Sequence, residues 1–232
     1  MHIGILQTGY APDQVAEKHG GFFTLFSKLL EGQGLTFSNW NVVDKDFPED
    51  VHAADGWLVT GSKHGAYEDH PFIPPLEDFI RSVHDQKIPM IGICFGHQII
   101  AQALGGRVEK FAGGWAVGHH EYEFEGMGPI ALNAWHQDQV VSMPPDAKRI
   151  ASSEFCENAA LVYGDHIMTL QPHPELPNPV IQTYIDVRSS DPSYPRPLME
   201  RAQEMVNAPH DEPRMADFLA DFLKAARAKA AA

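Results

Sequence analysis

Apolar and polar residues follow two different spacings along the first hundred positions, and the two spacings alternate. Short apolar runs, which predict buried strands, occupy residues 3–7, 35–43, 55–61 and 88–93. Apolar residues at three- and four-residue spacing, which predict helices, occupy residues 22–30 and 76–83. Strands that alternate with helices are typical of an α/β fold. We therefore expect a mostly parallel central sheet with helices on both faces.

The second half of the chain is richer in predicted strands, which adds a smaller antiparallel strand region to this fold. The expected strands lie at residues 115–117, 121–124, 130–135, 149–151, 160–163 and 167–170, and a helix follows at 178–187. Residues 189–197 contain three prolines and predict a linker before helical stretches near 198–206 and 214–229. We expect one domain over residues 1–232, with a core of 1–188 and the linker and C-terminal helices in 189–232. The last helix is amphipathic, and we expect it to pack on the same domain rather than on a partner.

Composition and charge narrow the classes of function. The 232 residues are 44% hydrophobic and 21% charged, and the net charge of −14 argues against binding nucleic acid or anionic membranes. The longest apolar runs are far too short to span a bilayer, and the N-terminus lacks the features of a secretory signal. Two cysteines, Cys94 and Cys156, do not make a disulfide framework. These features favour a reducing, cytoplasmic setting.

The segment Gly92-Ile93-Cys94-Phe95-Gly96 stands between a predicted strand and a predicted helix. Glycines on both sides of Cys94 permit a sharp turn, and the helix N-terminus would stabilise a thiolate. A turn of this kind lifts a nucleophile out of the sheet. The alternative is that Cys94 is a small buried apolar residue.

A second segment, Gln171-Pro172-His173-Pro174-Glu175, follows another predicted strand. The two prolines favour extended backbone at the residues before them and stiffen the loop. A histidine and a glutamate two residues apart are usually surface residues. Beside a thiol nucleophile, however, His173 would supply a base and Glu175 would orient it.

The two segments together resemble the class I glutamine amidotransferase family, which has a Cys-His-Glu triad. The resemblance covers nearly the whole chain, because segments at 59–62 and 135–138 also occur in the family's order. Within the family, the amidotransferase domain of GMP synthase and its stand-alone relatives are the most similar. The resemblance implies a small-molecule substrate, either glutamine or a γ-glutamyl compound, and no cofactor or metal.

The resemblance also implies roles for individual residues. Cys94 would attack the γ-carbonyl group, His173 would act as base and then as acid, and Glu175 would orient His173. The oxyanion would lie on backbone N–H groups of Phe95 and of Gly61 or Ser62, for which an ordinary turn after a strand is the alternative. Further substrate contacts are implied for two residues, Gln98 and His136. As alternatives, Gln98 caps the helix and His136 satisfies a loop carbonyl.

Three departures from the family bear on the function. Gly61-Ser62-Lys63 replaces the usual Gly-Gly-Pro, Pro172 replaces a bulky residue before His173, and only about 57 residues follow Glu175. Because no synthetase domain follows, we expect a self-contained hydrolase of glutamine or of γ-glutamyl amines and peptides. The alternatives are a glutaminase subunit that delivers ammonia to a separate synthetase, and an inactive binding or scaffold protein.

Two other parts of the sequence carry potentially reactive or metal-binding side chains. His119, His120, Glu121 and Glu123 are metal-ligand types, but adjacent residues of a strand face opposite sides. We therefore expect no metal site there. Cys156 is expected to be less reactive than Cys94, because its neighbours Glu154 and Glu157 disfavour a thiolate.

Overall fold

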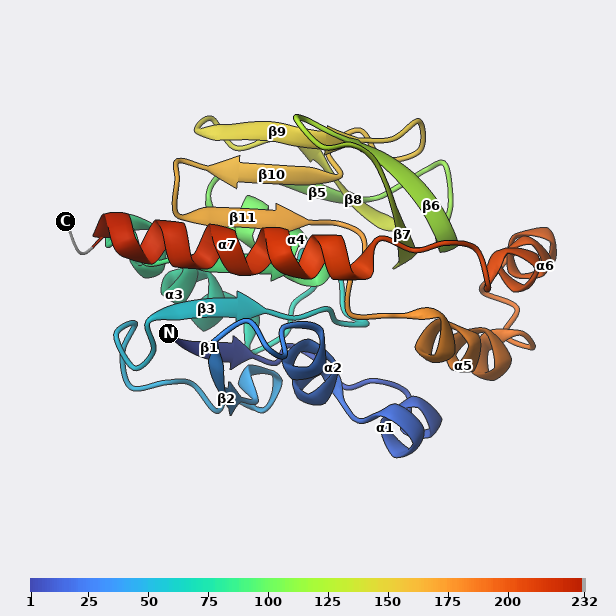
Figure 1. The fold of residues 1–232 in the computed structure, drawn as a ribbon, viewed down its shortest axis with the longest axis horizontal. Helices are drawn as coiled ribbons and strands as arrows, with labels where there is room; N and C mark the ends of the chain where they lie inside the picture. The colour runs from blue at the N-terminus through green and yellow to red at the C-terminus, as the bar shows by residue number, and fades with distance from the viewer. Residues whose placement is uncertain (231–232) are drawn as a thin grey trace.

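The computed structural model describes residues 1–230, and its centre is a nine-stranded sheet (Figure 1). Five neighbouring strands are parallel, in the order β2 (Thr36–Trp40), β1 (His2–Leu6), β3 (Gly56–Val59), β4 (Met90–Ile93) and β11 (Ile167–Leu170). The sheet continues with antiparallel strands, in the order β10 (Ala160–Tyr163), β9 (Ala147–Ser152), β6 (Ala116–Phe124) and β7 (Gly128–His136). The expected antiparallel region is therefore an extension of the parallel sheet. A separate antiparallel pair is formed by β5 (Arg107–Lys110) and β8 (Asp138–Ser142).

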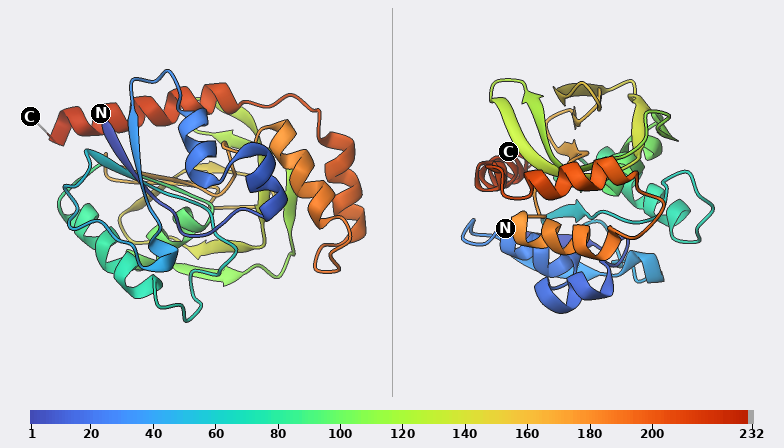
Figure 2. Two further views of the ribbon diagram at one scale, coloured as in Figure 1. Left: turned by 90° about the horizontal axis from the view of Figure 1, so that it is seen from below. Right: turned by 90° about the vertical axis from the view of Figure 1, so that its right-hand side faces the viewer.

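Helices cover both faces of the sheet, as expected. They are α1 (Asp13–His19), α2 (Phe22–Leu29), α3 (Ile73–Asp85), α4 (Phe95–Ala103), α5 (Asn178–Arg188), α6 (Arg196–Met205) and α7 (Glu212–Ala230). Strand alternation divides the core: Leu58 of β3 packs with residues of α2 and α7, whereas its neighbours Trp57 and Val59 pack with residues of α3 and α4. Figure 2 shows these layers from two further directions.

The carboxyl ends of β1, β3 and β11 point toward the same end of the molecule (Figure 1). At this end lie the loops that follow the parallel strands, and α5 and α6 stand beside it. Ligands of open parallel sheets bind at this edge, because the loops there are free to carry polar side chains. The fold therefore brings the segments after β3, β4 and β11 together.

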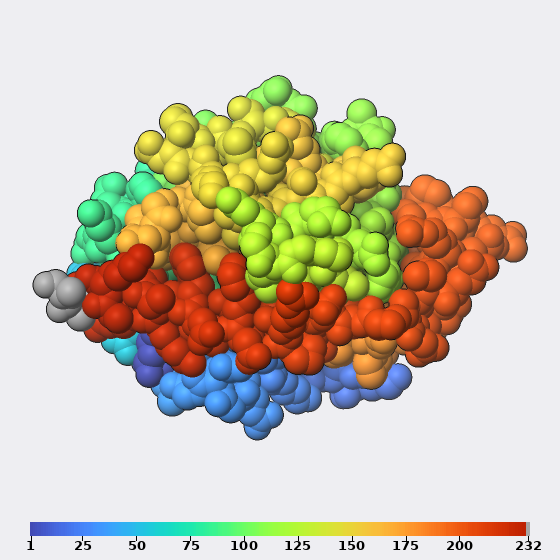
Figure 3. Space-filling model, turned by 45° about the horizontal axis from the view of Figure 1, so that its top comes forward, coloured from blue at the N-terminus to red at the C-terminus, as the bar shows by residue number. Residues whose placement is uncertain are grey.

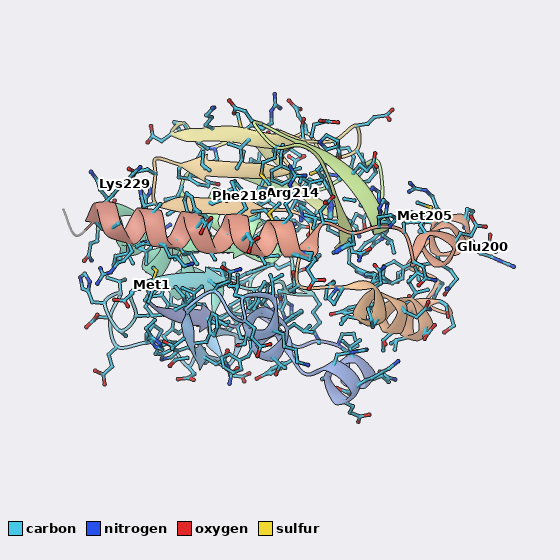
Figure 4. The ribbon with its side chains drawn as sticks, viewed as in Figure 1. Met1, Glu200, Met205, Arg214, Phe218 and Lys229 are labelled. Atoms are coloured by element: carbon cyan, nitrogen blue, oxygen red, sulfur yellow. The ribbon has the colours of Figure 1, made fainter. Side chains whose placement is uncertain are left out.

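Helix α7 packs its apolar side into the same core as the sheet, which confirms the expectation for this amphipathic segment. Leu219 and Leu223 are fully buried, and the ring of Phe218 packs edge-on against Phe124 of β6 with the centroids 6.5 Å apart. Arg214 donates a hydrogen bond to the carbonyl oxygen of Met127 at 2.6 Å. Figure 4 labels Arg214 and Phe218 on α7, and Figure 3 shows the helix crossing the surface below β6 and β7. In the described part of the chain no helix is both long and apolar enough to cross a membrane.

Candidate active site

Cys94 lies at the junction of β4 and α4, in a backbone conformation that residues other than glycine rarely adopt. Its φ is 55° and its ψ is −103°, and it is the N-cap residue of α4. Its amide N–H donates to the carbonyl of Leu170 at the end of β11, at 2.8 Å. Strained backbone of this kind is often found at functional residues. Cys94 is 5% exposed, and its side chain reaches a cavity.

The glycines that flank Cys94 are required by close packing of the backbone. A Cβ atom on Gly96 would lie 2.3 Å from the carbonyl oxygen of Val59, and one on Gly92 would lie 2.6 Å from that of Gly96. Both contacts are to backbone atoms, which cannot move aside without displacing a strand or a helix. This packing brings the start of α4 against the end of β3.

We expect Gly96→Ala to destabilise the protein by about 2–4 kcal/mol, because the new methyl group overlaps the backbone of Val59 in β3. Urea unfolding followed by circular dichroism measures the change. Gly21→Ala is the matched control, because a Cβ atom there meets nothing within 4 Å. It should cost less than about 1 kcal/mol. Equal unfolding free energies for the two variants would contradict this account of the turn.

His173 and Glu175 lie in the loop after β11, and β7 holds this loop in place. The amide N–H of His173 donates to the carbonyl of Asn133 at 2.8 Å, and the Asn133 side-chain amide donates to the carbonyl of Leu176 at 2.8 Å. Asn133 therefore holds both ends of the loop, because it accepts one hydrogen bond and donates the other. Asn133 was not predicted, because its role depends on a strand some forty residues earlier in the chain.

The side chains of His173 and Glu175 form a buried pair. Nδ1 of His173 lies 2.6 Å from Oε1 of Glu175, and the two side chains are 6% and 0% exposed. A Cβ atom on Gly61 would lie 3.2 Å from Cε1 of His173 and 3.8 Å from Cβ of Cys94, so the imidazole and the cysteine meet over Gly61. The structure thus brings together the three side chains singled out in the sequence.

Charge outweighs burial in setting the pKa of His173. Burial lowers this pKa, but the negative charges of Glu175 and Cys94 act against it and raise the pKa well above 6.5. An imidazolium next to a cysteine favours the thiolate, which is the nucleophilic form. His173 therefore keeps its proton to a higher pH than a free imidazole.

The first residue of α7, Glu212, lies close enough to Glu175 for the two carboxyl groups to interact. Burial and the charge of Glu175 both raise the pKa of Glu212, the first residue of α7. The chain before the helix is tied to β7, because the amide N–H of Asp211 donates to the carbonyl of Ala131 at 2.8 Å. Helix N-termini stabilise nearby anions. The C-terminal helix therefore contributes to the electrostatics of the site.

The predicted oxyanion residues lie around Cys94, with different surroundings. Gly61 borders both Cys94 and His173, as described above. The Ser62 hydroxyl donates to the carbonyl of Thr8 at 2.8 Å, and Ser62 lines the cavity. The Phe95 side chain is buried against Phe72, and Phe95 is the first residue of α4, so its amide N–H lies at the helix N-terminus. Over residues 1–230 the amide N–H groups of Gly61, Ser62 and Phe95 have no hydrogen-bond acceptor.

A cavity of about 520 Å³ connects Cys94 and His173 with Gln98 and His136. The Gln98 amide donates to the carbonyl of Asp138 at 2.9 Å and to the side chain of Gln171 at 3.2 Å. Neither ring nitrogen of His136 has a hydrogen-bond partner among the described residues, although the side chain is buried. Burial, and then the charge of His173, lower the pKa of His136 to about 3. His136 is therefore neutral and has a free donor and a free acceptor.

Other polar side chains of the cavity were not predicted. They are Lys63, His64, Tyr67, Glu68, Lys110 and Arg188. Ligand atoms of His64, Glu68 and His70 lie within 4.8 Å of one another, a spacing that could hold a metal ion. In this structure His70 and Glu68 share a 2.7 Å hydrogen bond that accounts for their contact. We assign no step to this group.

The remaining candidates lie outside the site. His119 pairs with the carbonyl of Pro209 at 3.0 Å, whereas the His120 ring lies 6.4 Å from that of Phe155, so the two side chains do not converge. Burial raises the pKa of the Cys156 thiol to about 12. This agrees with the expected low reactivity of Cys156, although burial rather than its acidic neighbours is the main cause.

Comparison with known proteins identifies the family. The family model described as glutamine amidotransferase class-I matches residues 34–181. The chain belongs to this family. The match runs from just before β2 into the first turn of α5 and includes Cys94, His173 and Glu175.

Relatives of this class I glutamine amidotransferase include proteins named for different activities. Gamma-glutamyl peptidase 4 of Arabidopsis thaliana is 32% identical over 183 residues, which are 72% of this chain and 73% of that protein. One subunit of a glutamine-hydrolysing GMP synthase from Methanopyrus kandleri is 29% identical, over 70% of this chain and 88% of that protein. Among solved structures, a glutamine amidotransferase from Methylobacillus flagellatus has a TM-score of 0.77 at 23% identity. The match covers 99% of this chain and 94% of the Methylobacillus flagellatus chain, so the two proteins share their fold over nearly their whole length.

Proposed function

We propose that this class I glutamine amidotransferase is a self-contained hydrolase of γ-glutamyl amide bonds, with Cys94 as the nucleophile. The observation that carries this proposal is the buried Cys94–His173–Glu175 cluster, which opens into a cavity of about 520 Å³. The similarity to γ-glutamyl peptidases of Arabidopsis thaliana supports the same class of reaction. Glutamate and a free amine or ammonia would be the products.

In the first half of the reaction, the Cys94 sulfur attacks the γ-carbonyl carbon while its proton resides on His173. The amide N–H groups of Phe95 and of Gly61 or Ser62 stabilise the negative oxygen of the tetrahedral intermediate. His173 then returns the proton to the amide nitrogen, so the carbon–nitrogen bond breaks and the amine leaves. A γ-glutamyl thioester on Cys94 remains.

In the second half, His173 removes a proton from a water molecule that attacks the thioester. The carbon–sulfur bond breaks, glutamate departs and Cys94 is restored. Glu175 keeps the imidazole oriented in both halves and stabilises its protonated form. All proton transfers thus pass through one histidine.

The polar side of the cavity is suited to the glutamyl part of the substrate. Gln98 and the neutral His136 offer hydrogen-bonding groups, and Lys110 and Asp138 offer charges of both signs for an α-carboxylate and an α-ammonium group. Burial raises the pKa of Asp138, and pairing with an ammonium group would act in the opposite direction. We propose that Gln98 and His136 contact the substrate.

The second candidate function is that of a glutaminase subunit which supplies ammonia to a separate synthetase. The similarity to the Methanopyrus kandleri GMP synthase subunit favours this alternative. The two functions differ in the leaving group, because ammonia needs little space whereas an amine or a peptide needs a pocket beyond the scissile bond. The size of the cavity favours the hydrolase.

We expect the purified protein to release glutamate from γ-glutamyl peptides without any partner, and to do so with a higher kcat/KM than from glutamine. Glutamate is measured enzymatically over a panel of γ-glutamyl amides at equal concentration. Glutaminase activity that appears only after a synthetase is added would favour the second candidate function. No glutamate release under either condition would contradict the proposal and favour an inactive binding protein.

A further inference from the structure

Four aromatic side chains form a continuous wall on one side of the cavity. Trp115 precedes β6, Trp135 is in β7, Tyr184 is in α5 and Tyr194 lies between α5 and α6. The ring of Tyr194 lies 4.6 Å from that of Trp115 and 5.4 Å from that of Trp135 between centroids, and Trp135 lies 5.3 Å from Tyr184. The Trp135 indole N–H donates to the Tyr194 hydroxyl at 3.1 Å. We call these four residues the aromatic wall.

The aromatic wall is built from segments that are distant in the chain. Helices α5 and α6, with the segment between them, stand at the end of the molecule where β6 and β7 lie (Figures 1 and 2). Trp115, Trp135 and Tyr194 are only partly buried. Their partly exposed aromatic faces line the same cavity as Cys94 and His173. They offer apolar area for a ligand, because removing such area from water is favourable.

The chemistry of the reaction places the leaving group on the side of the wall. His173 must protonate the departing nitrogen, so the amine leaves next to the imidazole. Tyr184 lies on this side, because it lines the same cavity as His173 and is in α5, the helix that begins three residues after Glu175. The Gln98 amide instead points to Asp138, whose side chain accepts a hydrogen bond from the Tyr67 hydroxyl at 3.2 Å. The polar groups and the aromatic wall therefore receive different parts of a substrate.

Arg188 adds a positive charge beside the wall. It lies one helical turn after Tyr184 in α5 and lines the same cavity. Its guanidinium is 3.5 Å from the carboxylate of Asp191, and both side chains are partly exposed. An exposed pair of this kind is weak, so Arg188 can turn to a carboxylate of a bound ligand.

We propose that the aromatic wall and Arg188 form a leaving-group subsite for an α-amino acid with an aromatic side chain. The preferred substrates are then γ-glutamyl dipeptides such as γ-glutamylphenylalanine. The side chain stacks on Trp115 and Tyr194, and its free carboxylate pairs with Arg188. This inference rests on the proposed hydrolase function and specifies its leaving group. The bond that breaks and the proton transfers are those given above.

A matched set of substrates tests the subsite. The set comprises γ-glutamylphenylalanine, γ-glutamylalanine, the γ-glutamyl amide of phenethylamine, and glutamine. We expect kcat/KM for γ-glutamylphenylalanine to exceed that for γ-glutamylalanine by about tenfold or more, because of stacking, and that for the phenethylamide by about fivefold or more, because of the carboxylate. Equal values across the set would overturn the subsite and leave the hydrolase function intact.

Variants connect the preference to the residues. Tyr194→Ala should lower the ratio of kcat/KM for γ-glutamylphenylalanine to that for glutamine about tenfold, whereas Tyr194→Phe, which keeps the ring, should leave the ratio nearly unchanged. Arg188→Gln should remove the preference for the dipeptide over the phenethylamide. A wall that only anchors the segment before α6 would lower thermal stability in Tyr194→Ala without changing the ratio, and that result would overturn the proposal.

A binding measurement separates the subsite from catalysis. In Cys94→Ala, calorimetry should give a Kd for γ-glutamylphenylalanine about tenfold below that for γ-glutamylalanine. This result would uphold the subsite even if no substrate were turned over, an outcome that would contradict only the hydrolase function. Equal Kd values in this variant would overturn the subsite.

Discussion

We expect Cys94→Ala to abolish glutamate release, with kcat/KM falling by at least about 10⁴-fold, because no other group near the γ-carbonyl can form the thioester. His173 and the amide N–H groups of the turn remain in this variant. What persists is therefore the contribution of binding and of oxyanion stabilisation alone. The assay is glutamate release from the best γ-glutamyl substrate, followed over hours so that a small residual rate is detectable.

Cys156→Ala is the matched control, because it removes the other thiol of the chain. Cys156 is buried, and burial raises its pKa to about 12, so it is protonated at neutral pH. We expect its variant to retain kcat/KM within about threefold and to lose about 1 kcal/mol of unfolding free energy from the lost packing. Activity retained in Cys94→Ala, or lost in Cys156→Ala alone, would refute the assignment of Cys94 as nucleophile.

Stability adds an independent test of the turn at Cys94. Its φ of 55° with a ψ of −103° suits glycine and strains any side chain. Cys94→Ala keeps this strain and should unfold with nearly the wild-type free energy, within about 1 kcal/mol. Cys94→Gly relieves the strain and should be more stable than Cys94→Ala by about 1 kcal/mol, although equally inactive. A less stable glycine variant would show that the turn is not strained.

Most elements with a run of buried apolar residues were predictable, whereas α1 and β5, with one buried residue each, were not. The bounds of β10 and β11 agree with the sequence pattern, because their residues are almost all apolar and both strands are buried. Helix α1 was missed because Val15 is its only buried residue, and β5 was missed because only Val108 is buried among charged neighbours. Strand β6 was expected as two pieces. It is continuous, and Gly118 with a φ of 75° interrupts its apolar pattern without breaking its pairing.

The chemical centre of the site could be found in the sequence, whereas its walls could not. Cys94 and His173 each follow a buried strand, and parallel neighbours bring the ends of two such strands together. The residues around them come from loops and edges whose proximity is set by tertiary packing. Asn133 acts through two hydrogen bonds to the loop that carries His173, and the aromatic wall combines a strand, a helix and a linker. None of these carries a local spacing that marks it as part of a site.

Glu175 controls the acid–base behaviour of His173. Glu175 is the largest influence that raises the His173 pKa, and burial acts in the opposite direction. The imidazolium is needed to hold the Cys94 thiolate and to protonate the leaving amine. In the wild type, activity should therefore decline on the alkaline side only above a pH well beyond 6.5, where the imidazolium loses its proton.

We expect Glu175→Gln to lower kcat by about 10²–10³-fold and His173→Ala by at least about 10⁴-fold, because the first impairs orientation and charge and the second removes the proton carrier. With the carboxylate gone, burial dominates and the His173 pKa falls, so the alkaline limb of kcat/KM should move to lower pH.

Glu212→Gln, which removes a neighbouring carboxylate that does not contact the imidazole, is the control. Its alkaline limb should stay at the wild-type position. A kcat in Glu175→Gln no lower than that in Glu212→Gln, with an unmoved alkaline limb, would show that Glu175 acts only by filling space. A shifted limb would report the lost negative charge and its hydrogen bond to the imidazole, because glutamine fills the same space as glutamate.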